Sequence, residues 1–281
     1  MTTHTLSFGS ANLRIMLRFV KTANFADLWD DLLAEGHSAF TTADLQERTG
    51  ASLDSVYSAV KYAMDRHRLF SPVRGLYVVV PPEHRAAGVV PAVQFVDPMM
   101  RHLTIGYYVA YASAAQWWGA AHQAPQVFDV VTSRNVLDRD LGPVRLRFHT
   151  SSRIEADAVR RVVGPRTMLN VASPSLTAVD LATRPRLGGG LSSVATILTE
   201  LPDLDGNQLA ELAGRRTVAD ARRLGWLLDL VRDDLDLDAL HRVARPDDGR
   251  PTLLAPRGTR QGHVDERWGV LVNTTVEPDE T

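Results

Sequence analysis

Apolar residues near the beginning of the chain recur at intervals of three and four positions. They fall at Phe25, Leu28, Trp29, Leu32 and Leu33, a spacing that places them on one face of an α-helix. A glycine follows where the pattern ends, and glycine is common just beyond a helix. The pattern therefore predicts an amphipathic helix that begins at about Phe25 and ends before the glycine.

Two further helices are predicted directly after the first. Thr41 and Asp44 have the spacing of a capping box, in which each side chain hydrogen-bonds the backbone N–H of the other residue. Gly50 closes this short helix, and Ser52 is the candidate N-cap of a third helix that reaches about Leu69. Two helices joined by a tight glycine turn form a helix-turn-helix.

The third helix is predicted to have one buried and one exposed side. Its inward stripe consists of Val56, Ala59, Val60, Ala63 and Met64. The rest of its surface carries hydroxyl, aromatic and basic side chains, which are the types that contact base edges and phosphates. Together with one residue of the preceding helix, the candidate DNA-binding residues here are Thr42, Ser52, Ser55, Tyr57, Ser58, Lys61, Tyr62 and Arg66.

The next segment, LFSPVRGLYVVV over residues 69–80, predicts a β-hairpin with a turn from Pro72 to Gly75. A hairpin directly after the third helix is the wing of a winged helix-turn-helix, and Arg74 at its turn is a further candidate DNA contact. The alternative is a small helical bundle with a solvated polar face. The order of three helices, glycine turn and hairpin favours binding to double-stranded DNA.

The chain beyond residue 92 mixes strands and helices. Residues 104–122 predict an alanine-rich helix whose large aromatic residues, such as Tyr108 and Trp118, form a buried core or, alternatively, line a ligand pocket. Alternating apolar residues predict strands at 127–132 and 144–149. Helical spacing then returns in three segments, at 209–213, 219–231 and 237–243.

These patterns predict an α+β protein of two domains. The N-terminal winged helix-turn-helix domain covers residues 1–88, and a larger mixed α/β domain with a helical C-terminal part covers residues 89–281. The linker is placed near residues 81–92, because this stretch is rich in proline and glycine.

Composition narrows the chemistry. The chain has 281 residues and no cysteine, which excludes disulfides, thiolate metal sites and cysteine nucleophiles. The histidines show no metal-ligand spacing and the serines no nucleophile-elbow motif, so we expect neither a catalytic centre, a metal nor a cofactor. No stretch suits a membrane span, and the start MTTHTLSFGS lacks the features of a signal peptide, so a cytoplasmic location is expected.

Charge is unevenly distributed although the formal net charge is only −2. Residues 191–281 carry eleven Lys/Arg against seventeen Asp/Glu, so DNA contacts are expected in the first two thirds of the chain. The most basic segment is either a second nucleic-acid or phosphate surface or a solvated face. Its residues are Arg145, Arg147, Arg153, Arg160, Arg161 and Arg166. Gly188–Gly190 lack the following Lys-Ser or Lys-Thr of a phosphate loop and predict a flexible turn.

The segments RGLYVVVPPEH and YVAYASAAQWWGAAHQAPQVFDVVTSRN resemble the AbiEi antitoxins of bacterial type IV toxin-antitoxin systems. Further similarity lies in the helix start Ser-Pro-x-x-Thr-x-x-Asp-Leu at residues 173–181, although Ser175 and Leu176 stand where charged residues are usual. It continues through Gly190 and Leu191, Arg223 to Gly225, and the closing RWGVLVN at residues 267–273.

The resemblance implies a bifunctional, non-enzymatic antitoxin. Its winged domain would repress its own operon, and its C-terminal domain would neutralise a nucleotidyltransferase-like toxin without a stable complex. Two alternatives stay open from the sequence. One is a ligand-sensing winged-helix regulator without a toxin partner, and the other is an enzyme whose C-terminal domain modifies the toxin or a nucleic acid.

Overall fold

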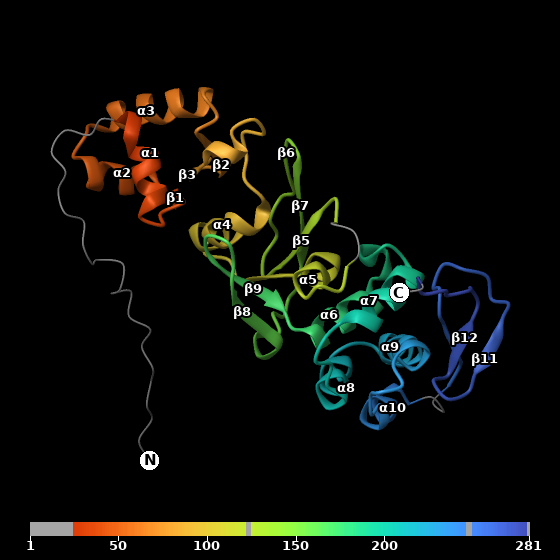
Figure 1. Cartoon of the computed structure of the whole chain (residues 1–281). Coiled ribbons are helices and arrows are strands. Elements are labelled where there is room, and N and C mark those ends of the chain that lie inside the picture. Colours follow the sequence, from red (N-terminus) through yellow and green to blue (C-terminus); the bar gives the residue numbers. More distant parts are fainter. Residues whose placement is uncertain (1–24, 122–124, 246–248, 280–281) are drawn as a thin grey trace, which may run out of the picture. The chain divides into compact units, whose positions relative to one another are not determined.

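The computed structural model describes residues 25–121, 125–245 and 249–279 of the chain, which divides into two compact units (Figure 1). Unit 1 is Met1–Val90 and unit 2 is Pro91–Thr281. The segment MTTHTLSFGS, in which the sequence shows no signal peptide, lies outside the described residues. Within the described ranges, no helix has the length and apolar character needed to cross a membrane.

Unit 1 combines helices with a small antiparallel sheet of strand order β1-β3-β2. Its elements are α1 (Phe25–Ala34), β1 (Ala39–Phe40), α2 (Thr42–Thr49), α3 (Leu53–Asp65), β2 (Leu69–Val73), β3 (Leu76–Val79) and the 3₁₀ helix η1 (Pro82–His84). The order helix, strand, helix, helix and hairpin is the topology of a winged helix. The helices and the hairpin that the sequence predicts are therefore present.

Local hydrogen bonds fix where these helices begin and end. The Thr41 hydroxyl accepts from the Asp44 backbone N–H at 3.2 Å, and the Asp44 carboxylate accepts from the Thr41 N–H at 2.7 Å, which confirms the capping box. Gly50 then adopts a left-handed conformation with φ of +66°. The Ser52 hydroxyl accepts from the Ser55 N–H at 3.3 Å and caps α3.

The core of unit 1 lies between α1, α3 and the sheet. Trp29 stacks on Phe40 with ring centroids 5.7 Å apart, and Val56, Val60 and Ala63 bury the inner side of α3. Met64 was predicted to point inward, but it is 36% exposed because it lies at the edge of the inner stripe. That part of the prediction is wrong.

Two predicted boundaries in unit 1 also need correction. Helix α3 ends at Asp65 rather than near Leu69, because His67 takes a positive φ of 53° and the Arg68 N–H donates back to the Ala63 carbonyl. The chain then turns directly into β2. The hairpin turn is shorter than predicted, since β2 extends through Val73 and leaves only two residues between the strands.

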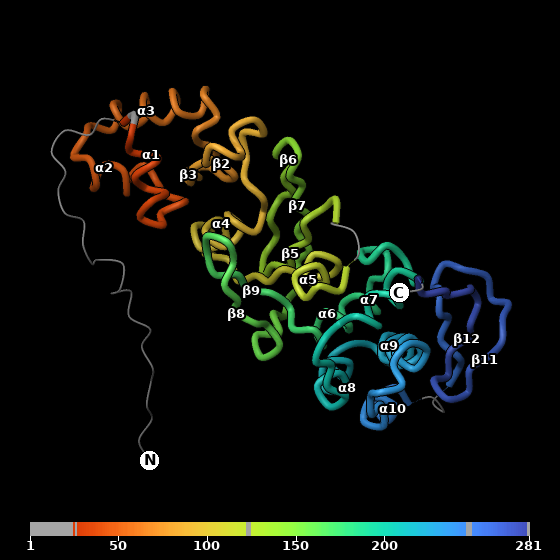
Figure 2. The backbone as a smooth tube through the Cα atoms, in the orientation of Figure 1, coloured from red at the N-terminus to blue at the C-terminus, as the bar shows by residue number. Residues whose placement is uncertain are grey.

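Unit 2 is built on a six-stranded mixed sheet of order β6-β7-β5-β4-β9-β8. Its central strand β4 pairs antiparallel with β5 and parallel with β9. Figure 2 follows the backbone through this sheet. The first elements of unit 2 are η2 (Ala92–Gln94), α4 (Val96–Leu103), β4 (Tyr107–Val109), α5 (Tyr111–Trp117), β5 (Phe128–Thr132), β6 (Arg139–Leu141), β7 (Val144–Thr150), η3 (Ala156–Ala158), β8 (Val159–Val163) and β9 (Met168–Ala172).

The prediction of one helix over residues 104–122 is wrong for the first part of this range. Tyr107 to Val109 form strand β4, and only Tyr111–Trp117 are helical. All three residues of β4 are buried because the strand lies in the middle of the sheet. A strand buried on both faces has no alternating pattern, which removes the usual sequence signal. The aromatic residues Tyr107, Tyr108 and Tyr111 are buried, as the core interpretation expects.

Helices fill the rest of unit 2. They are α6 (Pro174–Thr183), η4 (Pro185–Gly188), α7 (Leu191–Glu200), α8 (Gly206–Gly214), α9 (Val218–Val231) and α10 (Asp238–Ala244), followed by the sheet β10-β12-β11 formed by Thr252–Leu253, Val270–Val272 and His263–Asp265. Helices α8, α9 and α10 contact one another (Figure 1). The three helical segments predicted here are confirmed, and so is the α+β class.

Candidate functional site

The exposed side of α3 carries most of the candidate DNA-binding residues. Opposite the buried Val56, Val60 and Ala63, the helix exposes a polar surface. Its members are Ser52, which caps the helix, and Ser55, Tyr57, Ser58, Lys61, Tyr62 and Arg66. Tyr57 and Tyr62 are 49% and 60% exposed, which is unusual for large aromatic side chains. Exposed tyrosines with serines and a lysine form a surface able to contact base edges and phosphates.

The charge of this surface is balanced. Asp54 and Asp65 lie on the same exposed side of α3 as Lys61, and the sequence prediction did not include them. Arg66 adds a second cation, and its guanidinium lies 4.4 Å from the centre of the Tyr62 ring. Because anions and cations are equal in number here, hydrogen bonds and shape carry more of any DNA recognition than net charge does.

The remaining predicted contacts flank α3. Thr42 begins α2 and is half-buried, whereas Arg74 is exposed at the turn between β2 and β3. Gly75 follows Arg74 with φ of +86°, a conformation that lets the two-residue turn close. The turn therefore holds the Arg74 side chain at the tip of the wing.

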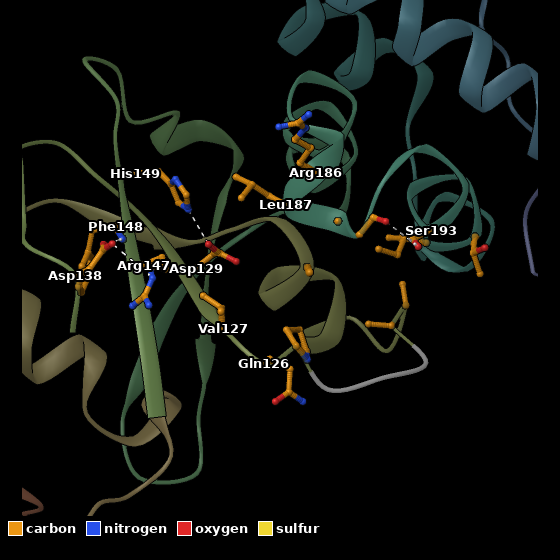
Figure 3. A pocket seen from close by; sticks show the side chains of 18 of the residues that line it. Gln126, Val127, Asp129, Asp138, Arg147, Phe148, His149, Arg186, Leu187 and Ser193 are labelled. Atoms are coloured by element: carbon orange, nitrogen blue, oxygen red, sulfur yellow. Dashed lines mark hydrogen bonds and ion pairs between the residues drawn. The ribbon is translucent and has the colours of Figure 1, made fainter. Parts of the chain in front are cut away.

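Unit 2 contains an open cleft of about 820 Å³ between the sheet and the α6–α7 connection. Figure 3 shows His149 and Asp129 on one side of it, with Arg186 and Leu187 across from them. Its walls are partly apolar, with Val127, Phe148 and Leu187 among the lining residues. A concave site with apolar walls and a few polar groups is the usual form of a small-molecule site.

A histidine–aspartate pair lies in the floor of this cleft. The His149 Nε2 atom is 2.7 Å from the Asp129 Oδ1 atom, and the Asp129 side chain is only 7% exposed. Strands β5 and β7 are parallel neighbours, and this register brings residues that are twenty positions apart into contact. The Asp129 backbone N–H donates to the Ser113 hydroxyl at 2.9 Å, which fixes the start of β5 beside α5.

Tyr111 lies against this pair in a strained backbone conformation. Its ring meets the His149 ring edge-on with centroids 5.1 Å apart, and its φ is +53°. For an aromatic residue this conformation costs about 1–2 kcal/mol. It occurs where strand β4 turns directly into helix α5, and such strain is concentrated at functional positions.

Residues 107–230 match the family model described as the AbiEi antitoxin C-terminal domain. This part of the chain is therefore similar to the C-terminal domain of AbiEi antitoxins. This confirms the resemblance seen in the sequence and supports an antitoxin role. Asp129, His149 and Arg186 lie within the matched range, as do the other lining residues of the cleft except Asp279.

A solved structure shares the fold over most of the chain. The crystal structure of the RV2827C protein from Mycobacterium tuberculosis superposes with a TM-score of 0.65 at 19% sequence identity, covering 89% of this chain and 92% of that chain. At this identity the likeness shows the fold alone. A comparison with curated proteins gives no match.

Unit 2 also contains a buried ionic network. The Asp180 carboxylate accepts from the Tyr108 hydroxyl at 3.0 Å and from Arg216 at 3.3 Å. Arg216 and Arg215 both bind Glu155, which is only 2% exposed. Burial raises the pKa of Asp180 to about 6, although the neighbouring arginine opposes this shift. The network joins α6 to η3 and to the segment after α8.

The basic segment predicted over residues 145–166 does not form one surface. Arg145 and Arg147 lie on β7, next to one edge of the sheet, whereas Arg160 and Arg161 lie on β8 at the opposite edge. Arg147 is also paired with Asp140 at 2.8 Å. In the described part of the chain, no group of three or more His, Asp or Glu residues is arranged to hold a metal ion.

Proposed function

We propose that the chain is a type IV antitoxin that acts through both units. Unit 1 binds double-stranded promoter DNA and represses the operon, and unit 2 neutralises a nucleotidyltransferase-like toxin encoded beside it. The observation that carries the proposal is the AbiEi domain match, which supports the antitoxin role directly. No catalytic step is assigned to either unit.

The DNA-binding part of the proposal rests on the winged topology and on the exposed side of α3. In helix-turn-helix proteins the second helix of the motif enters the major groove. Here that helix is α3, which presents Ser55, Ser58 and Lys61 to solvent. Lys61 and Arg66 would bind phosphates, and Arg74 at the wing tip would reach the backbone or the minor groove.

Lys61→Ala tests the phosphate contact. The variant should bind promoter DNA and unrelated DNA more weakly by similar factors, and the slope of log K against log salt should flatten by about one unit. Arg242→Ala is the matched control, because it removes an exposed cation from α10 in unit 2. If gel-shift titrations of Lys61→Ala gave the affinity and slope of the control, Lys61 would not contact DNA.

Toxin neutralisation is tested separately from repression. The toxin gene is expressed with the full chain or with Lys61→Ala/Arg66→Ala, and growth and promoter activity are both recorded. The double variant should rescue growth like the wild type while promoter repression is lost, because the two activities reside in different units. Loss of both activities in a folded double variant would contradict this division.

The cleft of unit 2 favours a second candidate, a ligand-sensing regulator without a toxin partner. Its volume of about 820 Å³ and its partly apolar lining suit a small molecule. The co-expression experiment distinguishes the candidates, because a regulator of this kind would not rescue growth from any neighbouring toxin gene.

A further inference from the structure

Helix α3 exposes an apolar stripe beside its polar surface. Leu53, Tyr57 and Met64 are spaced by four and seven residues, so they lie along one side of the helix. Their exposed fractions are 43%, 49% and 36%. Single exposed apolar residues are ordinary on a protein surface, but a row of three large ones on one helix indicates contact with a partner.

The charges of α3 indicate which part of the helix faces the bases of a duplex. Asp54 is exposed in the first turn, where DNA phosphates would repel its carboxylate, whereas the third turn carries the cation Lys61. The first two turns therefore suit the base edges in the floor of the major groove, and N-terminal residues of a recognition helix are those that contact bases. Leu53 and Tyr57 lie in these two turns.

The side chains of α3 do not suit the recognition of purines. Adenine is bound by paired hydrogen bonds from asparagine or glutamine, and guanine by those from arginine or lysine. Helix α3 has no asparagine, glutamine or arginine, and its only lysine is Lys61 in the third turn. Thymine instead presents a C5-methyl group in the major groove, and apolar side chains contact this methyl. The exposed stripe of α3 matches that apolar group.

We propose that α3 recognises thymines in the major groove, with Leu53 and Tyr57 in contact with their C5-methyl groups. The proposal rests on the promoter binding proposed for unit 1 and names the bases that this binding reads. The exposed hydroxyl of Ser58, next to Tyr57, can donate to the thymine O4 atom. The Asp54 carboxylate is only an acceptor, which disfavours guanine because guanine presents two acceptors in the major groove.

The test compares two versions of the DNA upstream of the gene, by fluorescence anisotropy of the full chain. In the second version deoxyuridine replaces every thymine, which removes the methyl groups but keeps base pairing and charge. Affinity for the deoxyuridine duplex should be about tenfold lower, because burial of two methyl groups contributes about that factor. This comparison needs no protein variant, so it does not depend on how a substitution affects folding.

Leu53→Ala/Tyr57→Ser identifies the side chains involved. Both residues are exposed, so the variant should fold. It should bind the thymine duplex about tenfold more weakly than the wild type does, and it should no longer distinguish the thymine duplex from the deoxyuridine duplex. Leu230→Ala is the matched control, because it removes an exposed leucine from α9 in unit 2 and should keep the difference between the duplexes.

Three results would overturn the proposal. The first is equal affinity of the wild type for both upstream duplexes, with a shuffled duplex bound more weakly, and it would leave promoter binding intact. The second is an unchanged deoxyuridine effect in the folded double variant, because DNA shape would then be the cause. The third is a smaller species of the double variant in sedimentation velocity with both duplexes bound alike, because a second copy of the chain would then cover the stripe.

Failure of the proposed function would look different. In that case the wild type would bind the upstream thymine duplex and a shuffled thymine duplex with equal affinity, which would contradict promoter binding itself.

Discussion

Replacement of Gly225 by alanine is expected to destabilise unit 2 although alanine is the better helix former. Gly225 lies inside α9 against the fully buried ring of Trp268. A Cβ atom built at this position would lie 2.0 Å from the Trp268 Cζ3 atom and 2.1 Å from its Cε3 atom. Carbon atoms in contact are normally about 3.5–4.0 Å apart.

The size of the effect follows from this overlap. A deficit of about 1.5–2 Å is too large for small adjustments in a packed core, so the tryptophan ring must leave its site. Loss of a buried tryptophan side chain costs about 3–5 kcal/mol, and the helix propensity of alanine returns about 1 kcal/mol. We therefore expect Gly225→Ala to lower the free energy of unfolding by about 2–4 kcal/mol.

The assay is urea unfolding of the full chain, followed by far-UV circular dichroism and tryptophan fluorescence. Gly214→Ala is the matched control, because a Cβ atom at Gly214 would meet only Val243, at an ordinary distance of 3.9 Å. Gly214→Ala should leave the free energy of unfolding unchanged or raise it by up to about 1 kcal/mol.

A double-mutant cycle identifies the cause. In a Trp268→Ala background the steric conflict is gone, so Gly225→Ala should become neutral or stabilising. If Gly225→Ala were as stable as Gly214→Ala, or equally destabilising with and without Trp268, the contact between α9 and Trp268 would be described wrongly.

Two further predictions concern other parts of the chain. Ser52→Ala should destabilise unit 1 by about 1 kcal/mol in thermal unfolding because it removes the α3 cap, whereas Ser58→Ala on the same helix should have almost no effect. The pKa of Asp180 is about 6 in the folded state and about 4 in unfolded chains, so its contribution to stability is lost as pH rises through this window. Because asparagine does not titrate, the stability of Asp180→Asn relative to the wild type should rise by about 2 kcal/mol between pH 4 and pH 7. Urea unfolding at several pH values measures this difference, and the same pH dependence in both proteins would contradict the prediction.

Local signals in the sequence predicted unit 1 well. The capping box at Thr41, the left-handed Gly50 and the Ser52 cap each involve residues within three or four positions of one another, so their geometry is encoded by spacing. The end of α3 was missed because it depends on the left-handed conformation of His67 and on the hydrogen bond from the Arg68 N–H to the Ala63 carbonyl. No local sequence pattern predicts the left-handed conformation of His67.

Unit 2 was harder to predict because its features depend on distant residues. Strand β4 has no alternating pattern, since it is buried in the middle of a sheet whose neighbours come from later in the chain. The pair of His149 and Asp129 arises from the register of β5 and β7. Nothing in the spacing of these residues marks them as partners, and the place of Arg186 in the lining of the same cleft also depends on residues far away in the sequence.

The central claim is that α3 reads a DNA sequence, and fluorescence anisotropy of the full chain tests it most directly. The labelled duplexes carry either the DNA upstream of its own gene or the same bases in shuffled order, at about 150 mM salt. We predict an affinity for the upstream DNA at least about 1000-fold higher, with this preference lost in Ser55→Ala/Ser58→Ala/Lys61→Ala. Equal affinity for both duplexes, or an unchanged preference in the folded triple variant, would contradict the claim.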